Sequence, residues 1–132
     1  MIGQTISHYR ILEKLGEGGM GVVFKAQDLK LDRLVALKFL PPHLSASEQE
    51  KARFIQEAKA ASALNHPNVC TIYGIEEHGG QEFIEMEYVD GITLGEKIQQ
   101  AQMKTNDAIF YAIGIGEALQ EAHSKGIVHR DI

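Results

Sequence analysis

Three glycines near the N-terminus have a spacing that suits contact with phosphate groups. Gly16, Gly18 and Gly21 form the pattern G-x-G-x-x-G. Because glycine has no side chain, backbone N–H groups at such positions can approach phosphate oxygens closely. Dinucleotide-binding folds use the same pattern to open a helix, with an acidic residue about 20 positions later. An ordinary glycine-rich hairpin is the structural alternative.

The residues after these glycines favour a hairpin between two strands. Val22 to Lys25 are typical of a strand by β-propensity, and Pro41-Pro42 stand where a dinucleotide-binding fold would have its acidic residue. A P-loop would need Gly-Lys-Ser/Thr after the last glycine, and the sequence has none. The pattern therefore predicts a hairpin turn that covers phosphates. A dehydrogenase remains a third alternative, which an absence of NAD binding would remove.

A lysine and a glutamate downstream could complete a phosphate site. Lys38 lies in an otherwise apolar strand, Leu34 to Leu40, and Glu57 falls within the apolar stripe of a helix predicted over Ser47 to Leu64. An ion pair between the two would aim the ammonium at phosphates. The alternatives are a Lys38 side chain that reaches solvent from the strand face, and a Glu57 that is an exposed charge on the helix surface.

The remaining pattern predicts mostly strands first and helices afterwards. Expected strands are Tyr9–Leu15, Val22–Gln27, Leu34–Leu40, Asn68–Glu76 and Glu82–Val89. Two helices are expected after Asp90-Gly91, over Thr93–Ala101 and over Thr105–Ser124, the second capped by Thr105 or Asn106 and by Gly126. The change of character makes Glu87–Gly91 a candidate hinge.

The second of these helices is unusual because it is apolar on every side. Ala108–Gly116 carries no charge, and a helix of this kind is normally buried all round. Gly114 and Gly116 each cost about 1 kcal/mol relative to alanine, which indicates close packing against another element. Too little chain follows residue 124 to cover the helix, so its packing partners are expected outside this polypeptide, and the bare surface is expected to aggregate.

Composition excludes several classes of protein. The 13 basic and 18 acidic residues give a net charge of −5, which argues against nucleic acid as a partner. The single cysteine, Cys70, excludes an intrachain disulfide; its neighbours predict a half-buried strand position and an inert thiol, which fits a reducing cytoplasm. No leader and no apolar run of about 18 residues is present, so neither a signal peptide nor a membrane span is expected.

Together, six motifs in order resemble the protein kinase family, specifically the bacterial serine/threonine kinases of eukaryotic type. Each motif alone is suggestive, and their joint order is specific. They are Gly16-Glu-Gly-Gly-Met-Gly-Val-Val23, Val35-Ala-Leu-Lys38, Glu57, His66-Pro-Asn-Val69, Met86-Glu-Tyr-Val89 and His129-Arg-Asp131, with Ile132 where the family has leucine.

The resemblance implies an α+β fold with a kinase-like N-lobe, a five-stranded antiparallel sheet plus one helix, over residues 1–86. A hinge over 87–91 and the first helices of a C-lobe over 92–132 would follow. It also implies ATP as cofactor and protein serine or threonine hydroxyls as acceptors. The implied ATP-binding residues are Leu15, Gly16, Glu17, Gly18, Gly19, Met20, Gly21, Val22, Val23, Ala36, Lys38, Met86, Glu87 and Val89.

By the same resemblance, Lys38 would contact the α- and β-phosphates, braced by Glu57, and Asp131 would orient the substrate hydroxyl or accept its proton. Mg²⁺ is expected for a complete domain, but the family's metal ligands would lie beyond Ile132, so none is assigned here. This polypeptide alone is therefore expected to have no measurable turnover. The alternative is a non-catalytic module that binds nucleotide or a partner protein.

Overall fold

The computed structural model describes residues 1–18 and 21–128 of the chain. These residues form two compact units. The first contains Met1–Ala63 and Thr71–Tyr88, and the second contains Leu64–Cys70 and the residues from Val89 onward. The short segment Leu64–Cys70 thus groups with the second unit, although the sequence places it between parts of the first.

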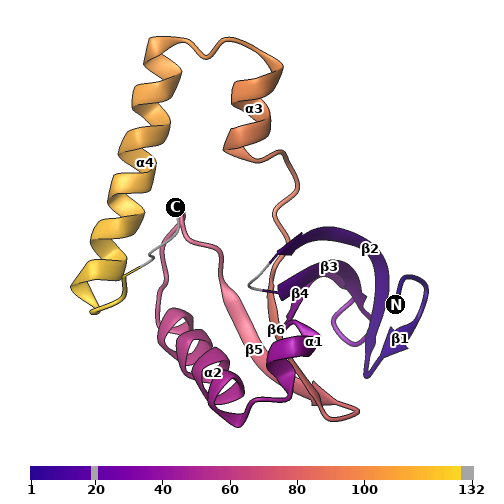
Figure 1. The fold of residues 1–132 in the computed structure, drawn as a ribbon. Coiled ribbons are helices and arrows are strands. Elements are labelled where there is room, and N and C mark those ends of the chain that lie inside the picture. Colours follow the sequence, from indigo (N-terminus) through magenta and orange to yellow (C-terminus); the bar gives the residue numbers. More distant parts are fainter. Residues whose placement is uncertain (19–20, 129–132) are drawn as a thin grey trace. The chain divides into compact units, whose positions relative to one another are not determined.

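The first unit is built on one antiparallel sheet, which curls strongly (Figure 1). Its order is β1-β2-β3-β4-β6-β5. The strands are β1 (Thr5–Ile6), β2 (Tyr9–Gly18), β3 (Gly21–Asp28), β4 (Arg33–Phe39), β5 (Ile72–His78) and β6 (Gln81–Glu87).

The α+β fold predicted from the sequence is confirmed, with one more strand than expected. β1 has only two residues, and its partners on β2 are Arg10 and Tyr9. Two residues are too few to show the alternation by which a strand is detected. The turn between the strands places Ser7 at a φ of 55°, which a sequence pattern does not reveal for serine.

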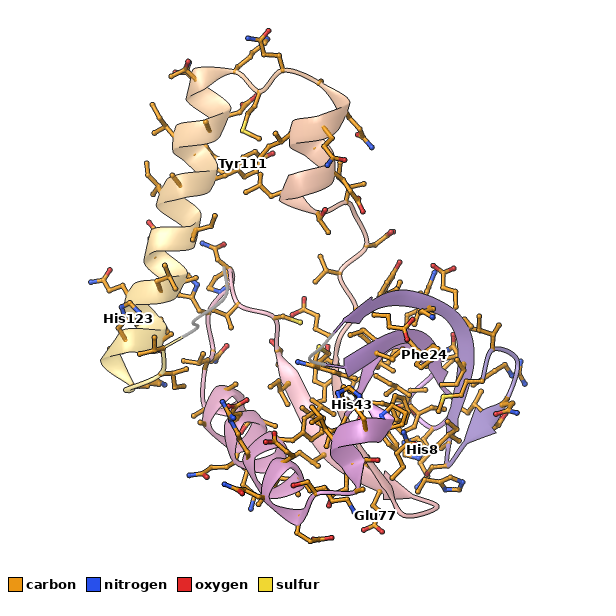
Figure 2. The ribbon with its side chains drawn as sticks, in the orientation of Figure 1. His8, Phe24, His43, Glu77, Tyr111 and His123 are labelled. Carbon is orange, nitrogen blue, oxygen red and sulfur yellow. The ribbon has the colours of Figure 1, made fainter. Side chains whose placement is uncertain are left out.

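Alternation along the strands sends one set of side chains into the curl of the sheet. On β4, Val35, Leu37 and Phe39 are buried on this inner face. Phe39 and Phe83 lie with ring centroids 4.9 Å apart, within the range of favourable aromatic pairs. Figure 2 shows side chains crowding around Phe24 in this region. The cluster comprises Tyr9, Ile11, Phe24, Ala26, Val35, Leu37, Phe39 and Phe83.

One polar pair lies among these apolar side chains. The Tyr9 hydroxyl donates to Glu85 Oε2 at 2.6 Å, and it joins the first long strand to β6. The second carboxylate oxygen of Glu85 lies 3.7 Å from the Arg33 guanidinium. Burial and the hydrogen bond to Glu85 raise the pKa of the Tyr9 phenol far above its ordinary value. Tyr9 therefore stays protonated, and remains a donor, at pH values where an ordinary tyrosine ionises.

Two helices pack on the first unit, α1 (Pro42–Ser45) and α2 (Glu48–Ser62). α2 begins as predicted, because the Ser47 side chain accepts from the backbone N–H of Glu50 at 3.3 Å. Phe54 and Ala58 are its buried residues, and they pack with Leu40 and Ile84 from the sheet. Hydrophobic contact on this face fixes how α2 lies on the sheet.

The second unit contains α3 (Leu94–Gln100) and α4 (Thr105–Ser124). Thr93 and Glu96 form a reciprocal capping box at the start of α3. The predicted cap of α4 at Thr105 or Asn106 is wrong, because Thr105 is already helical and Lys104 takes the cap position without a side-chain hydrogen bond. At the other end Gly126 has a φ of 76°, as a helix-terminating glycine requires.

α4 leaves its apolar run largely uncovered by the described residues. Phe110 is 72% exposed, and Ile109 and Ile113 are each more than half exposed. Gly114 has a packing reason, since the Asn68 side chain donates to its carbonyl oxygen at 3.1 Å and lies 3.5 Å from where a Cβ would be. Gly116 has no such neighbour in the described part of the chain.

The position of Cys70 differs from the one that the sequence predicts. Cys70 is exposed and precedes β5, so the prediction of a half-buried strand position is wrong. The strand begins only at Ile72, and the N–H of Thr71 before it donates to the side chain of Glu87. Within the described residues, none of the helices has the length and apolar character needed to cross a membrane.

The Tyr9–Glu85 pair gives a prediction about stability. Tyr9→Phe removes the donor and leaves a buried carboxylate oxygen without its partner, so the free energy of unfolding should fall by about 1–3 kcal/mol. Tyr73→Phe is the matched control, since Tyr73 is 42% exposed. Urea unfolding followed by circular dichroism measures both. Equal stability of the two variants would contradict a stabilising role for the pair.

The same pair predicts an alkaline loss of stability. The pKa of Tyr9 is raised in the folded state, so the unfolded chain binds fewer protons above the ordinary tyrosine pKa of about 10. The contribution of Tyr9 is therefore complete below about pH 10 and decreases as pH rises further. Unfolding free energies measured from pH 8 to 11 should fall more steeply for the wild type than for Tyr9→Phe. Parallel slopes would contradict this.

Candidate functional site

Strand register gathers several sequence-predicted site residues on one face of the sheet. Val23 on β3 is the cross-strand partner of Lys38 on β4. Ala36 on β4 is paired in the same way with Met86 on β6. Paired side chains point to the same side, and residues two apart on one strand do so as well. Val23, Ala36, Lys38 and Met86 therefore share the face opposite the aromatic core.

The glycine segment forms the ends of β2 and β3 beside this face. Gly16 is paired with Val23, after an irregularity in β2 between Lys14 and Gly16, and Gly18 is paired with Gly21. A Cβ at Gly16 or Gly18 would meet no described atom within 4 Å, so the backbone there is open to a ligand. Predicted residues Gly19 and Met20 lie outside the described residues.

The flanks of the segment offer one apolar and one charged side chain. Leu15 is 43% exposed, although it is a large aliphatic residue. An apolar side chain left uncovered beside such a face can pack against a flat ring. The predicted contact Glu17 is exposed and pairs with Lys14 at 2.5 Å. Val22 differs from its neighbour Val23, because it packs against the inner core.

Gly21 has a structural role of its own. Its φ is 134°, and a Cβ there would overlap the carbonyl oxygen of Phe39. Residues with side chains rarely adopt this conformation, and the close approach of β3 to the end of β4 leaves no room for one. Only glycine therefore suits this position, whether or not a ligand is bound.

Lys38 is half-buried and lines a small pocket under α2. Glu57 lines the same pocket, so the two residues predicted to pair do come to one place. The pocket is lined by Lys38, Leu40, Leu44, Glu50, Arg53, Phe54 and Glu57.

Glu57 has a different partner in this structure. Its Oε1 accepts from Arg53 Nε at 3.2 Å, and the Glu57 side chain is 57% exposed. Among the described residues, Lys38 makes no ion pair. Sequence reasoning missed Arg53, although its spacing of four residues from Glu57 is a recognised signal for a helical ion pair. The direct pairing of Lys38 with Glu57 stays a prediction.

The predicted ATP-binding residues Glu87 and Val89 are divided between the two units, with Glu87 at the end of β6. Glu87 is held to the segment before β5, since its backbone N–H donates to the Thr71 carbonyl at 2.8 Å and its side chain accepts from the Thr71 N–H. Val89 belongs to the second unit and is 66% exposed. The predicted catalytic Asp131 lies outside the described residues.

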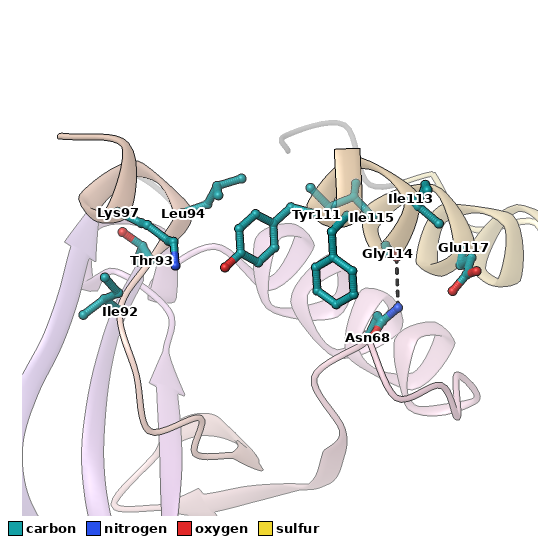
Figure 3. Close-up of a pocket in the computed structure, with 11 residues that line it drawn as sticks. Asn68, Ile92, Thr93, Leu94, Lys97, Tyr111, Ile113, Gly114, Ile115 and Glu117 are labelled. Carbon is teal, nitrogen blue, oxygen red and sulfur yellow. Dashed lines mark hydrogen bonds between the residues drawn. The ribbon is translucent and has the colours of Figure 1, made fainter. Parts of the chain in front are cut away.

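A separate hollow lies within the second unit, between α3 and α4 (Figure 3). Lys97 lies 5.4 Å from the centroid of the Tyr111 ring, and a side-chain hydrogen bond with Tyr111 raises the pKa of Lys97. Ile92, Leu94 and Ile113 supply apolar walls. None of the sequence-predicted site residues lines this hollow, so it is not the candidate nucleotide site.

Comparison with known proteins agrees with this geometry. Residues 9–132 match the family described as "Protein kinase domain". The chain belongs to the protein kinase family. The family predicted from the glycine, lysine, glutamate and His-Arg-Asp motifs is thereby confirmed, and the relatives found for this kinase chain are bacterial serine/threonine kinases.

Three of these relatives show how much of a whole kinase the chain covers. It is 38% identical to serine/threonine-protein kinase PknJ of Mycobacterium tuberculosis, over 98% of this chain and 22% of PknJ. Identity to pkn3 of Myxococcus xanthus is 42%, over 99% and 24% of the two chains. For PrkC of Bacillus subtilis it is 41%, over 100% and 21%. The chain spans less than a quarter of each relative.

A solved structure gives the same result for the fold. The crystal structure of the M. tuberculosis PknI kinase domain superposes with a TM-score of 0.83 at 30% identity, covering 100% of this chain and 54% of the PknI chain. The kinase-like fold predicted from the sequence is thus confirmed.

The two glycines Gly21 and Gly16 should respond differently to alanine. Gly21→Ala should lower the free energy of unfolding by about 2–4 kcal/mol, because it combines an unfavourable φ with overlap at Phe39. Gly16→Ala should change it by less than about 1 kcal/mol, because open space surrounds the new methyl group. Thermal or urea unfolding measures both. A Gly21→Ala variant as stable as Gly16→Ala would contradict this assignment.

Proposed function

We propose that this chain forms the nucleotide-binding part of a serine/threonine protein kinase. Its outer sheet face would bind ATP, and the longer protein would transfer the γ-phosphate to serine or threonine hydroxyls of a protein substrate. The observation that carries this proposal is the register that puts Val23, Ala36, Lys38 and Met86 on one face of the sheet. Apolar side chains there suit a purine ring, and the Lys38 ammonium suits its phosphates.

Each group on this face has a separate task in the proposed complex. Val23, Ala36 and the exposed Leu15 would enclose the adenine, and Met86 would limit the depth of its pocket. Gly16 and Gly18 would bring backbone N–H groups to the phosphates, since neither carries a side chain to hold the ligand away. Lys38 would contact the α- and β-phosphates. Positioning and charge neutralisation account for most of the catalysis of phosphoryl transfer.

Transfer itself would depend on residues outside the described part. Asp131 would orient the acceptor hydroxyl or take its proton. Mg²⁺ supplies neutralisation of phosphate charge when it is bound. Within residues 1–18 and 21–128, no three His, Cys, Asp or Glu side chains gather as a metal site.

Nucleotide binding tests this proposal directly. Lys38→Met should weaken binding of a fluorescent ATP analogue about 10- to 100-fold, because it removes a charge-assisted contact to phosphate. Lys30→Met is the matched control, since Lys30 is exposed in the turn after β3. Titrations of the purified 132-residue chain followed by fluorescence anisotropy measure both. Equal affinity of Lys38→Met and wild type would refute the assignment of Lys38.

A further inference from the structure

Two carboxylates, Glu50 and Glu57, and two cations line the pocket under α2. Arg53 and Glu57 are one helical turn apart, and Arg53 Nε donates to Glu57 Oε1 at 3.2 Å. Lys38, on the neighbouring strand, lines the same pocket and makes no ion pair with any described residue. Because the Arg53 contact engages Glu57 Oε1, the carboxylate is not fully available to a second cation.

We propose that Arg53 competes with Lys38 for the Glu57 carboxylate. Arg53 is then a positioning residue, which limits the fraction of molecules in which Glu57 braces Lys38. The proposal rests on the proposed function, because only nucleotide binding gives the Lys38–Glu57 pair a role.

The competition is close to balanced. Arg53 and Glu57 have side chains 61% and 57% exposed, and an exposed pair one turn apart biases a helix by only about twofold. Their order is also the less favourable one, because the acidic residue follows the basic residue along the helix. Lys38 is half-buried, so an ion pair there would be less screened by solvent. Removal of either cation would therefore be enough to change how Glu57 divides its time between the two.

The packing of α2 leaves this exchange to side chains. Phe54 and Ala58 are 8% and 3% exposed, and they anchor the helix against Leu40 and Ile84. Arg53 and Glu57 lie beside these anchors at the edge of the pocket. Hydrophobic contact thus holds α2 on the sheet independently of the cation that Glu57 contacts.

Carbodiimide cross-linking of the full chain separates the two partners. The reagent activates a carboxylate, and a lysine amine then displaces the urea and forms an amide bond; a guanidinium does not react in this way. A Lys38–Glu57 cross-link therefore reports the competing pair alone. Its yield, read by mass spectrometry, is compared with that of Lys51–Glu48, whose charged atoms lie 3.7 Å apart on the same helix.

Arg53→Met should raise the yield of the Lys38–Glu57 cross-link about twofold relative to this reference. Lys59→Met is the matched control, because it removes an exposed cation from the last turn of α2 and should leave the yield unchanged. An unchanged yield in Arg53→Met, with the reference cross-link intact, would overturn the proposal. So would an equal rise in Lys59→Met, which would indicate a general effect of charge.

Nucleotide affinity provides a second test of the competition between Arg53 and Lys38. Arg53→Met should bind the fluorescent ATP analogue about twofold more tightly than wild type, and should give no gain in a Glu57→Gln background. If binding depends on Lys38 but Arg53→Met alters neither affinity nor cross-linking, the Arg53 proposal alone is wrong. If cross-linking rises while Lys38→Met binds normally, the competition stands and the proposed function is wrong.

Discussion

The antiparallel register of β3, β4 and β6 is the constraint on which the candidate site depends. Burial of Val35, Leu37 and Phe39 in the aromatic core fixes which face β4 turns inward. Because side chains alternate, a slip of one residue would carry Lys38 into that core. Burying an unpaired ammonium costs far more than any local strand preference could offset. Burial of the apolar residues on either side thus fixes the face of the sheet on which Lys38 lies.

Two local features protect this register. Gly21 lets β3 approach the end of β4 so closely that no other residue fits, and the next residue, Val22, packs against the core. The hydrogen bond from Tyr9 to Glu85 holds the first long strand and β6 together within an apolar surrounding. Glu85 directly precedes Met86, so this buried pair also positions the strand that carries the predicted ATP-binding residues Met86 and Glu87.

Much of this arrangement could be predicted from the sequence, because hydrophobic periodicity and helix-capping residues are local features of a sequence. The hairpin at the glycines, the strand containing Lys38 and the Ser47 cap follow from such signals. β1 was too short to show a period, and the exposure of Cys70 depends on where β5 begins. Arg53 as the partner of Glu57 could not be decided either, since the choice between two cations depends on distances in the folded chain.

Mapping of nucleotide contacts by NMR tests whether ATP binds to the outer face of the sheet. Amide chemical shifts of the ¹⁵N-labelled chain would be followed while a non-hydrolysable ATP analogue is added. We expect the largest changes on the outer sheet face and its glycine segment, at Gly16, Gly18, Val23, Ala36 and Met86. Changes confined to the hollow between α3 and α4, around Lys97 and Tyr111, would contradict it.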